Sequence, residues 1–205
     1  MGYYIFSYAI DLKNITKAFG RKDSKLFENI ISSPDFIHYQ ENSFNDSVSV
    51  KEALHHIVFG EKYIEKDAHM YQYALITLCA YLGMELPYKH EIKLGYETDL
   101  INGFLETDFG IITCLEEDLL STPPQLGLPE VADWPQCGII EQPELQNLST
   151  MYSLANITEQ QITGLWEGTN DEDEDRACAY EGIKGVKDNI DFCIANNLSL
   201  ISFCH

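Results

Sequence analysis

Blocks of apolar and polar residues along the chain predict a mainly helical protein with a strand at each end. Residues 3–10 are rich in aromatic and β-favouring side chains, and residues 198–203 are similarly apolar, so both are predicted to be buried strands. The run from 67 to 82 is apolar on nearly all sides, which predicts a central buried helix closed by Gly83. Terminal strands separated by helices predict a small sheet in which the two chain ends pair or lie next to each other.

Helix start and stop signals divide the rest of the chain. Two capping boxes, Ser49 to Glu52 and Thr158 to Gln161, mark helix starts, because in each the first and last side chains bond to the other residue's backbone N–H. Together with other such signals they predict helices at residues 11–19, 24–31, 49–60, 98–105, 115–120, 144–154, 158–166 and 177–196. An extended segment is predicted near 91–95. The expected fold class is α+β, a mostly helical single domain spanning residues 1–205.

Two segments are predicted to be irregular. Residues 121–143 contain five prolines and two glycines, which predicts a long excursion of the kind that often carries function. Residues 170–175 end in five consecutive acids, which predicts a solvated acidic loop before the last helix. A calcium loop does not fit, because Arg176 or Asp175 occupies the position of the required glycine. Weak binding of divalent cations stays open as the alternative.

Negative charge is concentrated in one stretch of the chain. The net charge is −20, and residues 94–183 contain 19 acidic residues and a single basic one, Arg176, whereas residues 1–93 contain 12 acids and 10 bases. A field of one sign repels nucleic acid and anionic membranes and attracts basic proteins or cations. No apolar stretch approaches the roughly 20 residues of a membrane span. We therefore expect a basic protein partner, no nucleic acid and no membrane.

Short catalytic and metal-binding motifs do not occur in the sequence. GxSxG, HExxH, CxxC and the glycine-rich phosphate loops are all missing, so we predict no cofactor and no metal. The six cysteines follow no repeat spacing and no secretion signal precedes them, which predicts free thiols in a cytoplasmic protein. Cys79, Cys193 and Cys204 are expected to be buried, and Cys137, in a Trp-Pro-Gln-Cys-Gly turn, to be the most exposed.

Three segments carry a family resemblance: the opening MGYYIFSYAIDL, the segment EIKLGYETDLI at residues 91–101 and the ending NNLSLISFCH. Together they resemble an uncharacterised family of bacterial proteins of similar length, a family of domains of unknown function. The first and last segments are also loosely similar to YfbM-like proteins. The resemblance implies a bacterial, cytoplasmic, single-domain protein of mixed α and β structure, and it assigns no catalytic or binding residue.

The leading functional hypothesis is a non-enzymatic binding protein whose acidic face docks a basic partner. Its concrete version is an immunity protein or antitoxin that neutralises a basic toxin, with Trp134 or Trp166 as an aromatic anchor. The predicted partner-binding residues are Glu116, Glu117, Asp118, Asp133, Trp134, Asp171, Glu172, Asp173, Glu174 and Asp175.

The alternative is an enzyme whose site is assembled from dispersed residues near His90–Asp99, including Tyr96 and Glu97. Glu97 and Asp99 are two residues apart on a predicted helix and do not share a face, so they form a poor acid and base pair. A cleft with convergent polar groups would favour the enzyme, and a flat or convex acidic surface would favour the binding protein. A structural homo-oligomer is the third possibility.

Overall fold

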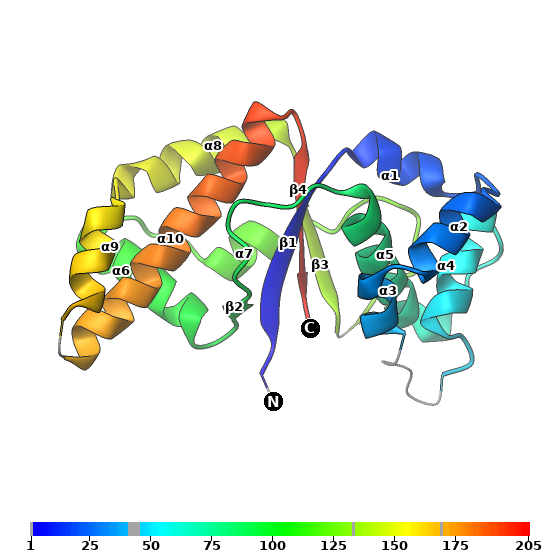
Figure 1. Ribbon diagram of the computed structural model, residues 1–205, viewed down its shortest axis with the longest axis horizontal. Coiled ribbons are helices and arrows are strands. Elements are labelled where there is room, and N and C mark those ends of the chain that lie inside the picture. The colour runs from blue at the N-terminus through cyan, green and yellow to red at the C-terminus, as the bar shows by residue number, and fades with distance from the viewer. Residues whose placement is uncertain (1, 41–45, 133, 169) are drawn as a thin grey trace.

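A four-stranded antiparallel sheet forms the centre of the computed structural model, which describes residues 2–40, 46–132, 134–168 and 170–205. The strands are β1 (Tyr4–Ile10), β2 (Ile92–Lys93), β3 (Gln136–Ile140) and β4 (Ser199–Cys204), in the spatial order β2-β1-β4-β3. The first and last strands therefore pair at the centre, with Tyr8 opposite Ile201 (Figure 1). The predicted α+β class and the pairing of the terminal strands are confirmed.

Helices from the first part of the chain cover one face of the sheet and form the amino-terminal lobe. They are α1 (Leu12–Ala18), α2 (Ser24–Ile31), α3 (Pro34–Tyr39), α4 (Val50–Phe59) and α5 (Ala68–Leu82), with the 3-10 turn η1 (Glu65–Asp67) before α5. Strand residues Ile10, Ile139 and Phe203 belong to the core of this lobe. The long helix α5 is buried on most of its surface, as its apolar sequence predicted.

Helices from the second part of the chain cover the opposite face and form what we call the acidic lobe. They are α6 (Glu97–Phe109), α7 (Leu115–Leu120), α8 (Gln142–Tyr152), α9 (Glu159–Trp166) and α10 (Asp171–Ala195), with the 3-10 turn η2 (Ser153–Ala155) after α8. Ile5, Ala9 and Leu200 face this lobe, because successive side chains of a strand point to opposite faces. Helix α10 packs along α6, α8 and α9 and closes the core.

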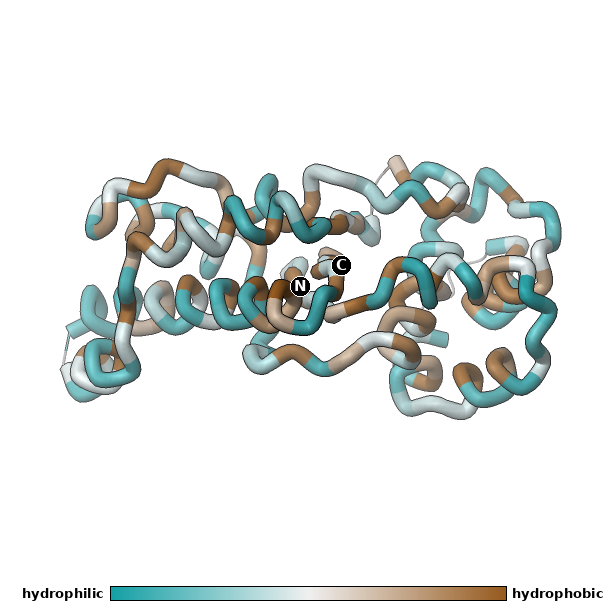
Figure 2. Tube along the Cα trace, turned by 90° about the horizontal axis from the view of Figure 1, so that it is seen from above, coloured by the Kyte–Doolittle hydropathy of each residue, from teal (hydrophilic) through white to brown (hydrophobic). Residues whose placement is uncertain are grey.

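The two lobes lie at opposite ends of an elongated molecule, with the sheet between them. Viewed from above, both chain ends lie next to each other near the middle (Figure 2). Each face of the same sheet supplies part of one lobe's core, so the sheet joins the lobes into one folded unit. Within the described residues, no helix combines the length and the apolar character that crossing a membrane requires.

Several predicted helix starts are confirmed at the level of their caps. The Ser49 hydroxyl accepts from the Glu52 N–H at 3.2 Å and the Glu52 carboxylate accepts from the Ser49 N–H at 2.8 Å, and the second capping box forms in the same way before α9. Helix α3 was not predicted. It begins at Pro34 after the cap residue Ser33, an arrangement that suits a helix start because proline has no N–H to satisfy.

The irregular excursion is shorter than the predicted 121–143, because β3 and the start of α8 lie within it. In the sequence, Pro135 and Gly138 indicate an irregular segment. Strand β3 is an edge strand, where a preceding proline is tolerated, and glycine in a strand often marks a close backbone approach. Here α7 approaches so closely that a Cβ on Gly138 would lie 2.3 Å from the carbonyl oxygen of Leu119.

The predicted acidic loop at 170–175 is wrong, since α10 begins at Asp171. The side chain of Asn170 caps the helix by accepting from the Asp173 N–H at 2.8 Å. Carboxylates in a first turn interact favourably with the positive end of the helix dipole. The run of charge therefore favours a helix start at Asp171, before the predicted start at residue 177.

Candidate functional site

Most of the acids of the second half of the chain lie on the helices of one lobe. Residues 94–205 contain 21 acidic and three basic residues, and their helices form the acidic lobe. All three bases form ion pairs with carboxylates of this lobe: Arg176 with Asp108 and Glu172, Lys184 with Glu159 and Asp188, and Lys187 with Asp191. The lobe therefore has many more carboxylates than cations that could neutralise them.

The three predicted partner-binding acids of α7 have different surroundings. Glu116 accepts from the side-chain amide of Asn102 at 3.1 Å, and Asp118 accepts from the Tyr152 hydroxyl at 3.1 Å. Burial raises the pKa of Asp118 above its ordinary value. Glu117, in contrast, is exposed. Glu116 and Asp118 are thus hydrogen-bonded within the lobe, and Glu117 is the member of the three that faces solvent.

The run of five acids occupies the first turns of α10, at the outer end of the acidic lobe (Figure 1). Its exposed members are Asp171, Glu172 and Glu174. Asp173 bonds to the cap residue Asn170, and Asp175 accepts from the Tyr96 hydroxyl at 3.5 Å. The last contact brings two sets of candidate residues together, because Tyr96 belongs to the segment that the enzyme hypothesis selected.

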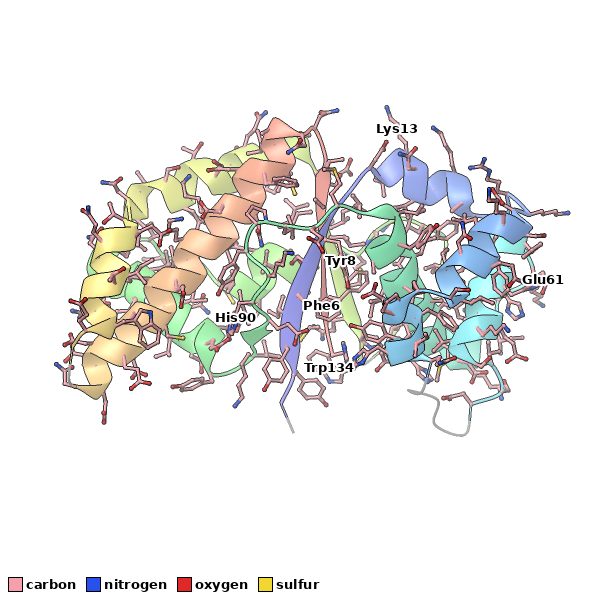
Figure 3. The ribbon with its side chains drawn as sticks, viewed as in Figure 1. Phe6, Tyr8, Lys13, Glu61, His90 and Trp134 are labelled. Carbon is pink, nitrogen blue, oxygen red and sulfur yellow. The ribbon has the colours of Figure 1, made fainter. Side chains whose placement is uncertain are left out.

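The two predicted aromatic anchors differ in their exposure. Trp134 is half-buried and stacks on Tyr3, with ring centroids 4.0 Å apart, near the amino-terminal end of β1 (Figure 3). Trp166, at the end of α9, is 48% exposed. Asp133 lies outside the described residues. Trp166 is therefore the tryptophan that offers more free surface on the acidic lobe.

The segment His90–Asp99 forms the end of a connection, strand β2 and the start of α6. Glu97 uses both of its carboxylate oxygens here: one lies 3.3 Å from His90 Nε2 and the other accepts from the Lys93 N–H at 2.7 Å. Asp99 is exposed. The segment is thus a strand, a turn and a helix start held together by Glu97, and its first residues, His90, Glu91 and Ile92, border a cavity.

That cavity is a pocket of about 540 Å³ between the two lobes, along the open edge of β1. On this edge β1 has neighbours only near its ends within the described residues, where Ile5 pairs with Ile92 and Ala9 with Met84. The chain between these pairs bends away. The N–H and C=O of Ala9 bond to Met84, and in an antiparallel ladder alternate residues point the same way, so the main-chain groups of Ser7 face the pocket.

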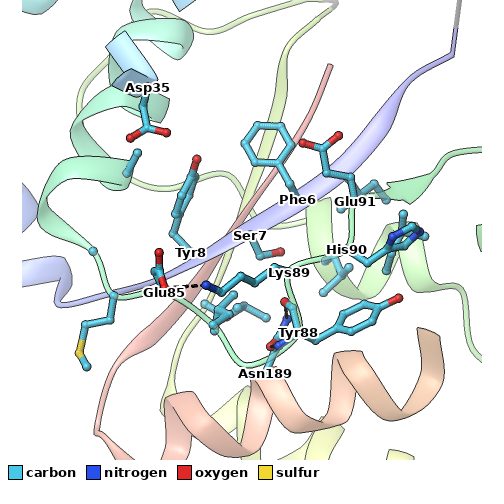
Figure 4. A pocket seen from close by; sticks show the side chains of 18 of the residues that line it. Phe6, Ser7, Tyr8, Asp35, Glu85, Tyr88, Lys89, His90, Glu91 and Asn189 are labelled. Atoms are coloured by element: carbon cyan, nitrogen blue, oxygen red, sulfur yellow. Dashed lines mark hydrogen bonds and ion pairs between the residues drawn. The ribbon is translucent and has the colours of Figure 1, made fainter. Parts of the chain in front are cut away.

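Most of the polar and aromatic side chains that line the pocket come from three segments (Figure 4). They are Phe6 and Tyr8 from β1, Asp35, His38 and Tyr39 from α3, and Glu85, Tyr88, Lys89, His90 and Glu91 from the connection between α5 and β2. Asn189 of α10 fixes that connection, because its side chain bonds to both the N–H and the C=O of Tyr88. The pocket therefore has walls from both lobes.

Two carboxylates give this pocket a negative potential next to aromatic rings. Burial raises the pKa of Tyr8 well above its ordinary value, and the charges of Asp35 and Glu91 raise it further. The same carboxylates raise the pKa of the neighbouring Tyr39, again after burial as the main cause. Both phenols are consequently protonated at neutral pH. The Lys89 ammonium group is bound to Glu85, four residues earlier in the chain, at 2.6 Å.

Sequence reasoning identified only one end of this pocket, the part near His90. The sequence pattern places Tyr8 and Phe6 in a buried strand, and it predicts no helix at Asp35. The chain has 12 tyrosines, and this count was the one sequence signal that indicated contact surfaces. The count does not show which tyrosines lie close together in the folded protein.

The burial of the cysteines follows from their positions in the sheet and the core. Cys79, Cys193 and Cys204 are buried, as predicted, but the expectation that Cys137 is exposed is wrong, since it is 8% exposed in β3 opposite Phe203. Burial raises its pKa. Within the described residues, no group of three or more His, Cys, Asp or Glu side chains is arranged to hold a metal ion.

The fold and its sites define a two-lobed α+β protein with an acidic lobe and an interlobe pocket. The chain belongs to a family described as a domain of unknown function (DUF7691), whose model matches residues 1–205. Comparison with curated proteins gave no match, and comparison with solved structures gave none either. Family membership assigns no activity.

Proposed function

We propose that this protein binds a basic protein partner through its acidic lobe and catalyses no reaction. The observation that carries the proposal is the difference in charge between the two parts of the chain: residues 94–205 contain 21 acids and three bases, and residues 1–93 contain 12 and 10. A field of one sign accelerates encounter with an oppositely charged protein and makes binding depend on salt. An immunity protein or antitoxin that neutralises a basic toxin in a bacterial cytoplasm is the concrete form of this proposal.

The docking surface that we propose consists of exposed residues on α7, α9 and α10. Glu117, Asp171, Glu172 and Glu174 would supply the charge, and Trp166 would supply a large side chain that becomes buried on binding. Glu116 and Asp118 are left out of this surface, because their carboxylates are already bonded to neighbours within the lobe. If a partner bound these two carboxylates, their hydrogen bonds within the lobe would be weakened or broken, and this costs free energy.

The experiment is affinity capture from the source cell with the immobilised full chain, followed by measurement of the dissociation constant of the captured protein. We expect a basic protein whose affinity falls at least tenfold between about 50 and 500 mM salt, since screening weakens attraction between exposed charges. An affinity that is indifferent to salt would contradict the proposal.

Matched variants test whether binding depends on carboxylates of the acidic lobe or on the net negative charge of the whole protein. The double variant Glu117→Gln and Glu174→Gln removes two exposed carboxylates from the acidic lobe and should weaken binding by about three- to tenfold. The control, Glu28→Gln and Glu65→Gln, removes the same charge from exposed positions of the amino-terminal lobe and should leave the affinity unchanged. Equal losses in both variants would argue against a docking surface on the acidic lobe.

A second candidate function, an enzyme, is favoured by one observation. His90 lines the interlobe pocket and lies 3.3 Å from Glu97, an arrangement in which a carboxylate can orient an imidazole for proton transfer. The test is incubation of a cell extract with the full chain and with the variant His90→Ala, followed by mass spectrometry. A compound consumed only by the unchanged chain would support this candidate, and identical extracts would contradict it.

A further inference from the structure

The interlobe pocket has walls that suit one class of ligand, independently of any partner of the acidic lobe. Its aromatic side chains are Phe6, Tyr8, Tyr39 and Tyr88. Phe6 lies edge-on to Tyr8 at 6.0 Å between centroids and is stacked with Tyr39 at 6.5 Å, so rings from β1 and α3 form one continuous wall. Ring faces attract cations through their quadrupole, and more strongly where water is excluded.

Carboxylates lie on both sides of this aromatic wall. Asp35 projects from the first turn of α3, and Glu91 lies just before β2, on the opposite side of the pocket. Figure 4 shows the Tyr8 hydroxyl pointing towards Asp35 and the Glu91 carboxylate beside the Phe6 ring. Lys89 lines the same pocket, but its ammonium group is bound to Glu85. An anionic ligand would be repelled here, and a cationic one would be attracted.

The main chain supplies a further acceptor. The carbonyl of Ser7 points to the pocket side of β1, in the gap between the pairs that Ile5 and Ala9 make. An ammonium group has three N–H donors and a guanidinium group has five, all of which need acceptors once they leave water. Carboxylates and a main-chain carbonyl are the acceptors that such donors require.

The ring of His205 adds no opposing charge. It contacts Phe6 and Tyr39, with centroids 5.5 and 5.4 Å away. Burial lowers the pKa of His205, so its imidazole is neutral at pH 7. A cation next to these rings therefore meets no repulsion from this side chain.

We propose that the interlobe pocket binds a small organic cation, an ammonium or guanidinium group attached to an aromatic or alkyl body. The charged group lies between Asp35 and Glu91 and donates to them and to the Ser7 carbonyl. The body of the ligand packs on Phe6, Tyr8 and Tyr39. A volume of about 540 Å³ is that of a site for a small molecule and exceeds what a bare inorganic ion needs.

The experiment is isothermal titration calorimetry of the full chain at pH 7 with three probes of one shape and different charge. These probes are 2-phenylethylamine, the neutral 2-phenylethanol and the anionic 3-phenylpropanoate. We expect saturable binding of the amine at one site and at least about tenfold weaker binding of the other two, the discrimination expected for charge-assisted hydrogen bonds. Agmatine, which carries a guanidinium group, should compete with the amine. No binding of either cation up to about 10 mM, or equal binding of all three probes, would overturn the proposal.

Variants locate the site. Asp35→Asn and Glu91→Gln each keep the size of an exposed side chain, and each should weaken binding of 2-phenylethylamine about tenfold. Glu106→Gln, on α6 and outside the pocket, makes the same change of net charge and should leave the affinity unchanged. If all three variants bind the amine equally, the attraction is diffuse and the pocket is not the site. The double variant Glu117→Gln and Glu174→Gln should bind the amine normally, which distinguishes this site from the docking surface on the acidic lobe.

Discussion

The side chain of Asn189 holds the main chain of Tyr88 by two hydrogen bonds, accepting from its N–H and donating to its C=O, each at 2.9 Å. The two residues are 101 positions apart in the sequence. Asn189 is buried on α10, and Tyr88 lies in the connection that forms one wall of the interlobe pocket. A single amide therefore joins the acidic lobe to the part of the chain that shapes the pocket.

Removing this amide should destabilise the protein. The variant Asn189→Ala leaves the main-chain groups of Tyr88 with fewer partners, and we expect a loss of about 1–3 kcal/mol in the free energy of unfolding. Urea denaturation followed by circular dichroism measures it. Asn147→Ala, at an exposed position, is the control and should stay within about 0.5 kcal/mol of the unchanged chain. Similar stabilities of the two variants would show that the contact to Tyr88 contributes nothing.

Two glycines should respond in opposite directions to substitution by alanine. A Cβ at Gly138 would lie 2.3 Å from the Leu119 carbonyl oxygen, so Gly138→Ala has to push α7 away from β3 and should cost about 1–3 kcal/mol. A Cβ at Gly164, within α9, meets nothing within 4 Å, and Gly164→Ala should stabilise the protein by about 0.5–1 kcal/mol. Thermal unfolding of both variants tests the pair. A stabilising effect at Gly138 would show that the helix moves at little cost.

Stability should depend on pH through Asp118. Burial raises its pKa in the folded state above the value of an unfolded chain, so between these two values the folded state binds more protons. Lowering the pH through this window therefore favours the folded state at this position, and the ionised carboxylate opposes folding at neutral pH. Asp118→Asn keeps an oxygen that can accept from Tyr152 and removes the charge. We expect the variant to be at least as stable as the unchanged chain at pH 7.

Denaturation between pH 4 and pH 7 measures this effect. The advantage of Asp118→Asn over the unchanged chain should shrink as the pH falls, because the native carboxyl then becomes protonated as well. An advantage that grows towards low pH would contradict the assignment. Glu117→Asn removes the charge of an exposed neighbouring acid and serves as the control.

The thiols should react slowly while the protein is folded. Burial raises the pKa of Cys178 to about 11, with added effects of Glu97 and Glu181, and burial also raises the pKa of Cys114. These two are the partly exposed cysteines, and the other four are buried. Since the thiolate is the reactive form, Ellman's reagent should modify Cys178 and Cys114 slowly at pH 7.5 and about tenfold faster per pH unit above it. Guanidinium chloride should release all six thiols. A thiol that reacts within seconds in the folded protein at pH 7.5 would contradict these pKa directions.

Helix starts with local determinants could be predicted from the sequence. Ser49 and Glu52 are three residues apart and complete their capping box without help from the rest of the chain. The same holds for Asp11 before α1, whose side chain accepts from the Lys13 N–H. The buried character of α5 could also be predicted, because an apolar residue on every side of a helix leaves no face for water.

Elements that depend on distant residues could not be predicted. Strand β3 exists because β4 offers it a ladder, and Gly138 is needed because α7 passes over it. The acids of the first turns of α10 predict a loop as long as the helix end that their charge stabilises is not known. Among the candidate residues, the sequence could not show that Glu116 and Asp118 bond within their own lobe while Glu117 faces solvent.

By itself the amino-acid sequence determined the class of fold, the strands at the two ends and the confinement of acidic charge to one part of the chain, since composition and short-range spacing are enough for these. Only the tertiary structure decided that this charge forms one lobe and that Tyr8, Asp35, Glu91 and Asn189 surround a pocket. These residues come from four segments far apart in the chain. Their proximity results from the sheet that places helices of both lobes on either side of β1, and no local pattern in the sequence records it.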